Sequence, residues 1–281
     1  TLLHRSEQFK LWCATFVAYG KTKLFSGQHG GGYGLSRFPN WTELNEHAIV
    51  DGFLGWGKFK SSSIDLGSCV QANSDNYKPN YSGKLLVVLG PVTRQQNNFN
   101  LGNVHCNSNY YASINELLQA LGVEKLSSVV VRPKVAHAKG KPARVSVSQI
   151  SEIFGKSIKL DLGSESLEYS LSESRLAVVT YNETTIPANL MANFPTIALW
   201  DPKYVRLNDR AAAVYDELLK AKILFHSPTD AAHHIATIWS EVDKWWSSKI
   251  VQSARLNYCD HYAHKVRFPA LTVASVIADN L

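Results

Sequence analysis

The chain has 281 residues, of which 45% are hydrophobic and 11% aromatic, enough for one large domain or two smaller ones with real cores. Its four cysteines stand far apart without a C-x-x-C pair, which argues against a disulfide framework or a zinc ribbon and favours a reducing compartment. No apolar run reaches the roughly 18 residues that suggest a membrane span.

The formal net charge of +6 suits an anionic partner, whether nucleic acid, a membrane surface or a phosphorylated metabolite. Simple solubility explains the same charge equally well. The basic residues gather near the ends of predicted strands, as in residues 125–144, and form no broad stripe with interleaved aromatics. We therefore expect no nucleic acid partner.

The chain begins at Thr1 and reads as helix from its first residues, so we expect it to be part of a longer protein with an upstream domain. A short apolar strand is predicted at residues 23–26. Residues 27–34 (GQHGGGYG) hold five glycines and cannot form a regular element. Residues 61–82 are rich in Ser, Asn, Gly and Pro and predict a linker or a long surface loop.

Apolar strands then alternate with helices, which predicts parallel strands and an α/β domain. The strands expected are 84–89, 128–131, 158–160, 176–180, 196–199 and 223–225, and the helices 113–121, 146–154, 188–192, 209–220, 228–246 and 250–264. Ligands of such domains bind beyond the carboxyl ends of the strands. That rule directs attention to residues 28–34, 91–94, 132–134 and 181–185.

The glycine-rich loop fits neither the dinucleotide pattern G-x-G-x-x-G nor a P-loop, because Tyr33 and Gly34 stand where a P-loop has Lys and Ser or Thr. Its glycines still allow backbone N–H groups to approach an anion closely. His29 is a candidate general base for an acceptor hydroxyl. The alternative is a structural turn in which the imidazole caps a backbone group.

Glu43 and Glu46 are three residues apart, a spacing that places both on one face of a helix. They are candidates to orient His29 or to act as acid and base, and the alternative is a solvated helix face.

Two further segments after strands carry candidate donor-binding residues. Arg132, Pro133 and Lys134 follow one strand, where a guanidinium and an ammonium can hold phosphate oxygens, and Arg94 has a similar placement after another. The alternative is a basic surface loop. Asn182, Thr184 and Thr185 precede a helix, and they are either phosphate ligands or ordinary caps.

No metal site is predicted, because no carboxylate or Cys completes a ligand set around the pairs His233 and His234 or His261 and His264. His226 is interpreted as a loop residue. Trp239, Trp245 and Trp246 are interpreted as core residues and not as a platform for a sugar.

Taken together, these motifs resemble a transferase family of bacterial surface-carbohydrate biosynthesis, which includes lipopolysaccharide and capsule. The resemblance runs from about residue 11 to residue 263. The segments that carry it are QHGGGYG (28–34), Glu43 with Glu46 and His47, FLGWG (53–57), VVTYNETT (178–185), NFPTIALWDP (193–202), ILF (223–225), and Ala231 with Ala232, then Trp245, Trp246, Val251, Gln252, Ala254 and Arg255.

The resemblance implies a GT-B-like architecture, in which two Rossmann-like domains face each other across a cleft. Residues 1–82 would be the end of an N-terminal, acceptor-side domain, and residues 83–247 a donor nucleotide-binding domain. Residues 248–281 would form a C-terminal helix that packs back across the domains.

The resemblance also implies an enzyme that transfers a sugar from a nucleotide-activated donor to a glycan or lipid-linked acceptor. It would need no cofactor, and it would act in the cytoplasm or at the inner face of the membrane. Gly30, Gly31 and Gly32 would help to hold the donor.

A wider likeness is to CDP-glycerol glycerophosphotransferases and to bacterial sialyl- and Kdo-transferases, which bind cytidine nucleotides. A polyol-phosphate transfer from a CDP-alcohol is therefore an alternative. A catalytically degenerate nucleotide-binding member is another, because Pro187 and Ala188 stand where the family leads us to expect Leu and Glu.

Overall fold

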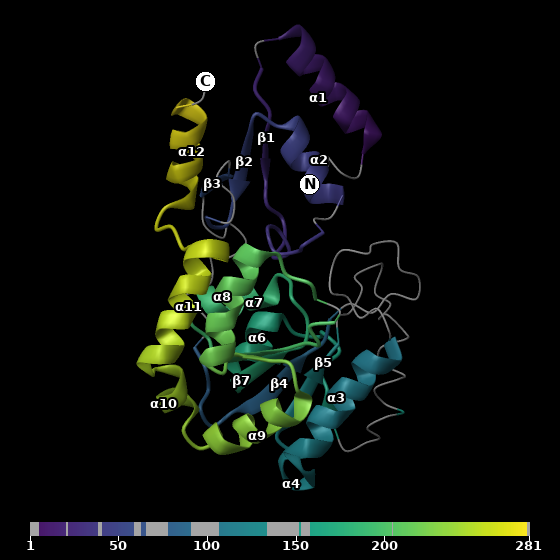
Figure 1. Ribbon diagram of the computed structural model, residues 1–281, viewed down its shortest axis with the longest axis vertical. Coiled ribbons are helices and arrows are strands. Elements are labelled where there is room, and N and C mark those ends of the chain that lie inside the picture. The colour runs from purple at the N-terminus through teal and green to yellow at the C-terminus, as the bar shows by residue number, and fades with distance from the viewer. Residues whose placement is uncertain are drawn as a thin grey trace.

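The computed structural model describes residues 6–20, 22–38, 41–58, 63–65, 78–90, 107–133, 152, 158–203 and 205–279. These residues form two parallel sheets, one of three strands and one of six (Figure 1). The smaller sheet lies with α1 (Glu7–Tyr19) and α2 (Trp41–Ile49) in one part of the molecule, and the larger sheet lies in the other.

The smaller sheet has the order β1 (Phe25–Gly27), β2 (Gly52–Gly55), β3 (Ser63–Asp65). The prediction of a loop at residues 61–82 is wrong for β3. Local composition there is typical of a loop, and the strand exists because its backbone pairs with β2, with Ile64 opposite Leu54. Pairing of this kind with a neighbouring strand often overrides local strand propensity.

The larger sheet has the order β6-β5-β4-β7-β8-β9, and all five pairings are parallel, as the alternation of strands and helices predicted. Its strands are β4 (Lys84–Val88), β5 (Val129–Arg132), β6 (Lys159–Leu160), β7 (Ser174–Val179), β8 (Thr196–Leu199) and β9 (Leu224–Phe225). Parallel pairing places the carboxyl ends of all six strands at one edge, where ligands of open α/β sheets bind.

Helices cover both faces of the larger sheet. One hydrophobic core joins strand residues such as Leu86 and Val179 to α7 (Thr185–Met191), α8 (Asp209–Lys220) and α11 (Lys249–Tyr262). The other joins alternate strand residues to α3 (Asn107–Leu121) and α9 (Pro228–Ile238). Burial on both faces explains why these strands read as continuous apolar runs.

Helix ends follow the local signals in most places. Gly122 follows α3 with a positive φ of +80°, which glycine adopts readily, and Ser227 caps α9 by accepting a hydrogen bond from the Asp230 amide at 3.1 Å, both at the predicted helix ends. Short helices also form at α4 (Val123–Leu126) and α6 (Leu167–Ser172). The helix predicted at residues 146–154 falls almost wholly outside the described residues.

The single helix predicted for residues 228–246 is two helices, α9 and α10 (Val242–Trp246). The Arg175 guanidinium lies 4.4 Å from the centre of the Trp239 ring and donates to the Trp239 carbonyl at 2.9 Å. This contact satisfies the carbonyl of the residue that caps the C-terminus of α9. A distant arginine therefore stabilises the helix end within a segment that is helical by its own pattern.

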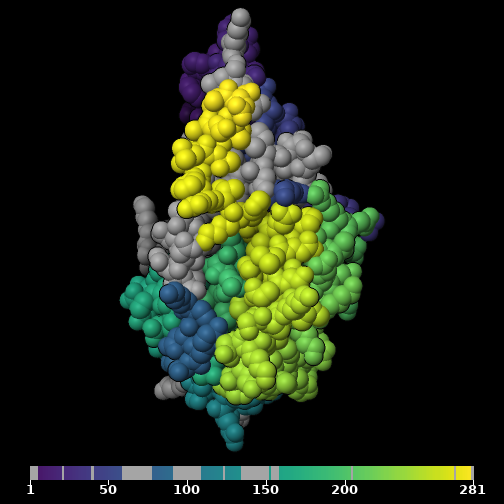
Figure 2. All heavy atoms as spheres, turned by 90° about the vertical axis from the view of Figure 1, so that its left-hand side faces the viewer, coloured from purple at the N-terminus to yellow at the C-terminus, as the bar shows by residue number. Residues whose placement is uncertain are grey.

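The C-terminal segment forms two helices rather than one. Helix α11 packs on α7 and α8 of the larger sheet, with Tyr258 and Val251 in the core. Helix α12 (Pro269–Asp279) extends along the part of the molecule that holds the smaller sheet (Figures 1 and 2). Among the described helices, none is long and apolar enough to cross a membrane.

Leu190 on α7 is 0% exposed and lies in the core between α7 and the larger sheet. We expect Leu190→Ala to lower the free energy of unfolding by about 2–5 kcal/mol, because the lost methyl groups leave a cavity in a close-packed core. The matched change Leu162→Ala, at a leucine that is 45% exposed, should cost less than about 1 kcal/mol. Urea titration of both variants measures the difference, and equal losses would contradict this description of the core.

We expect His234 on α9 to lower the free energy of unfolding in acid. Burial, together with the charge of Lys222, lowers the pKa of His234 to about 4, below its ordinary value of 6.5. The folded protein therefore binds fewer protons than the unfolded chain, and stability falls as the pH drops from 6.5 towards 4. We expect a loss of about 2 kcal/mol over that range. It should shrink in His234→Gln but not in a variant of the exposed neighbour, His233→Gln, when unfolding is followed at each pH.

Candidate functional site

The glycine-rich loop lies directly on the segment after β7. The Gly31 amide donates a hydrogen bond to the Thr184 hydroxyl at 3.2 Å, although the two residues are 153 positions apart. A Cβ atom on Gly31 would come within 2.7 Å of the backbone of Glu183 and Thr184. Only glycine allows this approach, so two of the segments singled out in the sequence meet backbone to backbone.

This meeting point adjoins the place where the strand order reverses. The chain leaves β4 towards β5 and β6 on one side, and β7 begins the run towards β8 and β9 on the other. Tyr110 links the two carboxyl ends there: the Gly90 amide donates to its hydroxyl at 2.7 Å, and that hydroxyl lies 2.5 Å from the Thr180 hydroxyl. Open α/β sheets bind their ligands in the crevice at such a reversal.

A buried hydrogen-bonded chain supports His29. The Tyr33 hydroxyl lies 2.6 Å from His29 Nδ1 and donates to Glu46 Oε2, also at 2.6 Å. Tyr33 has one hydroxyl proton and the carboxylate can only accept, so the Tyr33 oxygen accepts a hydrogen from His29 Nδ1. In neutral His29 the unshared pair is then on Nε2, which is the nitrogen that can take a proton.

Glu46 and Tyr33 are almost fully buried, with exposures of 1% and 4%. Burial, followed by the hydrogen bond to Glu46, raises the pKa of Tyr33 far above its usual range, so the phenol keeps its proton. Glu46 Oε1 also lies 3.8 Å from His29 Nδ1. A carboxylate at this distance stabilises the imidazolium that forms when His29 is protonated.

Glu43 differs from Glu46 because it bonds with the backbone of the glycine-rich loop. Its Oε1 accepts a hydrogen bond from the Gly34 amide at 3.1 Å, and the Gly34 carbonyl accepts one from Asn208 Nδ2 at 2.8 Å. Glu43 is 8% exposed, so the alternative of a solvated face for the two glutamates is wrong. Glu46 is the residue that reaches His29 through Tyr33, and Glu43 fixes the backbone of the loop.

Sequence reasoning missed Gln28 and Tyr33 as parts of the site. The Gln28 side chain donates to the Gly30 carbonyl at 2.8 Å and accepts from the Trp56 amide at 2.8 Å, and the Trp56 indole donates to the Gln28 carbonyl at 3.1 Å. These bonds attach the loop to β2. The only signal in the sequence was that Gln28 and Tyr33 flank the histidine and the glycines.

The predicted donor-binding residues after β7 are held by protein partners. Thr185 is buried and its hydroxyl bonds with that of Tyr181, while Asn182 Oδ1 accepts from the Tyr215 hydroxyl at 2.6 Å. Thr184 is the partner of Gly31, and Gly30 and Gly32 lie in the same loop. Their role in phosphate binding stays a prediction.

Arg132 ends β5 and its guanidinium is turned towards β6 and α6. It donates to Asp161 Oδ2 at 2.6 Å, to Ser170 Oγ at 2.8 Å and to the Glu165 carbonyl at 2.9 Å. Burial opposes ionisation of Asp161, but the hydrogen bonds from Ser170, Gly163 and Arg132 outweigh it and lower the pKa of Asp161. Phosphate binding by Arg132 stays a prediction, and Arg94 and Lys134 lie outside the described residues.

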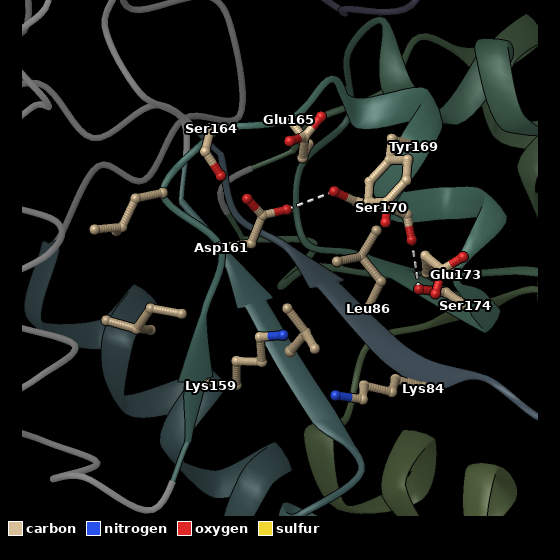
Figure 3. A pocket seen from close by; sticks show the side chains of 13 residues that line it. Lys84, Leu86, Lys159, Asp161, Ser164, Glu165, Tyr169, Ser170, Glu173 and Ser174 are labelled. Carbon is tan, nitrogen blue, oxygen red and sulfur yellow. Dashed lines mark hydrogen bonds between the residues drawn. The ribbon is translucent and has the colours of Figure 1, made fainter.

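Asp161 and Ser170 border a cavity of about 500 Å³ under α6 (Figure 3). Lys84 and Lys159 point into it from the starts of β4 and β6, and Leu86 and Val130 line it from the sheet. Glu165 and Glu173 also line it, so it shows no clear preference for one sign of charge. Within the described part of the chain, no three His, Cys, Asp or Glu side chains are grouped so as to hold a metal ion.

Residues 2–275 match the model of a family described as the LIC12162 family transferase. This match confirms the transferase family that the motifs resembled. A comparison with curated proteins found no match.

Among solved structures, the chain is similar to TarM, with a TM-score of 0.50 and 11% identity over 92% of this chain and 50% of TarM. A Listeria monocytogenes protein assigned as a UDP-N-acetylglucosamine 2-epimerase has a TM-score of 0.55 and 11% identity, over 95% of this chain and 70% of that one. The wall teichoic acid polymerase TagF has a TM-score of 0.45 and 10% identity, over 92% and 68%. The chain thus spans half the length of TarM. At these identities the likeness to TarM and to the Listeria protein shows the fold, which is the GT-B-like α/β architecture expected from the sequence.

The glycines of the loop offer a matched pair of tests. Gly31→Ala should destabilise the docked loop by about 1–3 kcal/mol, because the new methyl group overlaps backbone atoms that cannot move aside alone. Gly30→Ala should cost little, because its Cβ would lie 3.6 Å from the Thr184 hydroxyl, an ordinary contact. Thermal unfolding compares the two variants, and equal melting temperatures would contradict the close approach.

Proposed function

The chain belongs to the LIC12162 family of transferases, and from this premise we propose that it moves a sugar from a nucleotide-activated donor to a hydroxyl group of a surface-polysaccharide or lipid-linked acceptor. The observation that carries this proposal is the buried chain from Glu46 through Tyr33 to His29. This hydrogen-bonded chain supports His29 as a general base with a fixed tautomer. His29 lies on the loop that contacts the segment after β7.

In the proposed reaction, the acceptor oxygen attacks the anomeric carbon of the donor while His29 Nε2 takes the hydroxyl proton. The bond between the anomeric carbon and the phosphate oxygen breaks, and its electron pair leaves with the nucleotide. Glu46 stabilises the resulting imidazolium across the Tyr33 hydroxyl. General base catalysis of this kind contributes roughly 10²–10⁴-fold to a rate.

The donor nucleotide is proposed to lie in the crevice where the strand order reverses, with its phosphates near residues 30–32 and 182–185. Three features support this placement: the carboxyl ends of β4 and β7, a glycine loop whose backbone can approach an anion, and the docking of that loop through Gly31. Alignment of donor and acceptor supplies part of the remaining rate enhancement.

A degenerate nucleotide-binding protein is the second candidate. Pro187 and Ala188 are both buried within α7, so the carboxylate expected near the donor is replaced by apolar packing. Calorimetric titration with CMP, UMP and GMP separates the candidates. Binding without turnover favours the degenerate member, and the mass of any product distinguishes a transferred sugar from a polyol phosphate.

His29→Asn should reduce donor turnover by about 10²–10⁴-fold, because the variant cannot accept a proton at neutral pH. Tyr33→Phe should reduce it less, by roughly tenfold, since the base remains but its orientation is lost. The readout is the pH profile of kcat/KM in the wild type, whose acidic limb should vanish in His29→Asn. His233→Asn, at an exposed histidine of α9, is the control and should match the wild type. Wild-type activity in His29→Asn would exclude the proposed base.

A further inference from the structure

A second cavity, of about 310 Å³, lies beyond the carboxyl ends of β8 and β9. The residues that matter for its chemistry are Arg37, Trp200, Arg206, Asp216 and His226, all of which line it. None of these residues is among the candidate site residues that the sequence singles out, and His226 was expected only as a loop residue. The cavity stands at the same edge of the sheet as the candidate site, the edge where ligands of such sheets bind.

A short antiparallel pairing brings the two arginines together. The Arg37 amide donates to the Arg206 carbonyl at 2.9 Å, and Ser36 pairs with Leu207 in an isolated antiparallel bridge. Arg37 and Arg206 are therefore neighbours across this pairing and line one cavity from segments far apart in sequence. Within the described part of the chain, neither of them forms an ion pair with a carboxylate. An arginine without a protein counter-ion is well suited to a planar carboxylate or a phosphate.

His226 adds a side chain whose donor and acceptor nitrogens can be assigned. Its Nδ1 lies 3.0 Å from the Trp200 carbonyl oxygen. A carbonyl oxygen can only accept, so Nδ1 carries the hydrogen and neutral His226 presents an unshared pair at Nε2. Asp216 contributes a second acceptor to the lining. Two cationic donors and two acceptors thus line a cavity that is also lined by the largely buried Trp200, which is 6% exposed.

Two hydrogen bonds run from this cavity and from the segment beside it to the candidate site. Tyr215 lines the cavity, and its hydroxyl donates to Asn182 in the segment after β7. Asn208, two residues after Arg206, donates to the Gly34 carbonyl in the glycine-rich loop. The walls of the cavity are therefore bonded, directly or through the neighbouring Asn208, to both segments that the proposed reaction uses.

We propose that this cavity binds an anionic sugar unit of the acceptor, with the phosphate or carboxylate held by Arg37 and Arg206 and the ring hydroxyls bonded to His226 and Asp216. The volume supports one sugar-sized group, because it is near the lower end of about 300–1,000 Å³ for ligand cavities. The inference rests on the proposed function and adds the substrate class: an acidic acceptor instead of a neutral one.

The first experiment titrates the wild-type chain calorimetrically with glucose 6-phosphate, glucuronate and uncharged glucose. We expect the two anions to bind at least tenfold more tightly than glucose and to weaken as salt is added, because a charge-assisted contact is screened. The two anions also separate a phosphate site from a carboxylate site. Equal affinity for all three probes would overturn the inference without any variant.

The variants Arg37→Gln and Arg206→Gln should each weaken binding of the preferred anion at least tenfold. Arg37→Lys and Arg206→Lys keep the charge and lose the planar fork, so they should lie between wild type and Gln. Arg267→Gln is the matched control, because Arg267 stacks on the exposed Phe268 and does not line the cavity. Unchanged binding in the Gln variants would overturn the inference.

Nucleotide binding separates this inference from the proposed function. Both Gln variants should bind CMP or UMP as the wild type does, since the donor is proposed to lie at β4 and β7. If nucleotide binds and the sugar anions do not, the acidic acceptor is wrong and the transferase proposal stands. If the anions bind and no nucleotide does, the cavity is a sugar-anion site in a protein without the proposed activity.

Discussion

The close approach of Gly31 to the backbone of Glu183 and Thr184 is the constraint on which the candidate site depends. It joins a loop that leaves the smaller sheet to a segment that leaves the larger one, with no side chain between them. A hydrogen bond from Gly31 to the Thr184 hydroxyl fixes the contact. Because the contact is made at the backbone, the loop that carries His29 is placed directly on the segment after β7.

The support of His29 shows how burial and proton counting define a chemical role. Glu46 lies on α2 and Tyr33 on the loop, and both are withdrawn from water. The phenol keeps its single proton because its pKa is strongly raised, and it donates this proton to the carboxylate in a hydrogen bond. The His29 imidazole is therefore held in one orientation, in which Nδ1 contacts Tyr33 and Nε2 is the basic nitrogen. The same relation of base and orienting partners occurs in hydrolases with unrelated folds.

The charged side chains beyond the strands differ in their partners. An arginine there can bond either with polar groups of the protein or with a ligand. Arg132 follows β5 as the sequence predicted, yet its guanidinium is bonded to Asp161, Ser170 and a carbonyl of the β6–α6 connection. Arg37 and Arg206 lie in segments that no strand-end rule singled out, and they line a cavity without a carboxylate partner in ion-pair range among the described residues. Which arginines remain available to a ligand is decided by neighbours from other segments.

The sequence by itself determined the parallel α/β sheet, since apolar strands alternate with helices and local caps such as Ser227 and Gly122 mark the helix ends. It also indicated the family, through short motifs whose order along the chain is distinctive. Tertiary structure alone decided the existence of β3, the break between α9 and α10, and the parts played by Tyr33 and Gln28. Each of these depends on a hydrogen bond or backbone pairing whose geometry only the folded chain sets. Local propensity cannot specify such partners, because it describes a residue's neighbours along the chain and not across space.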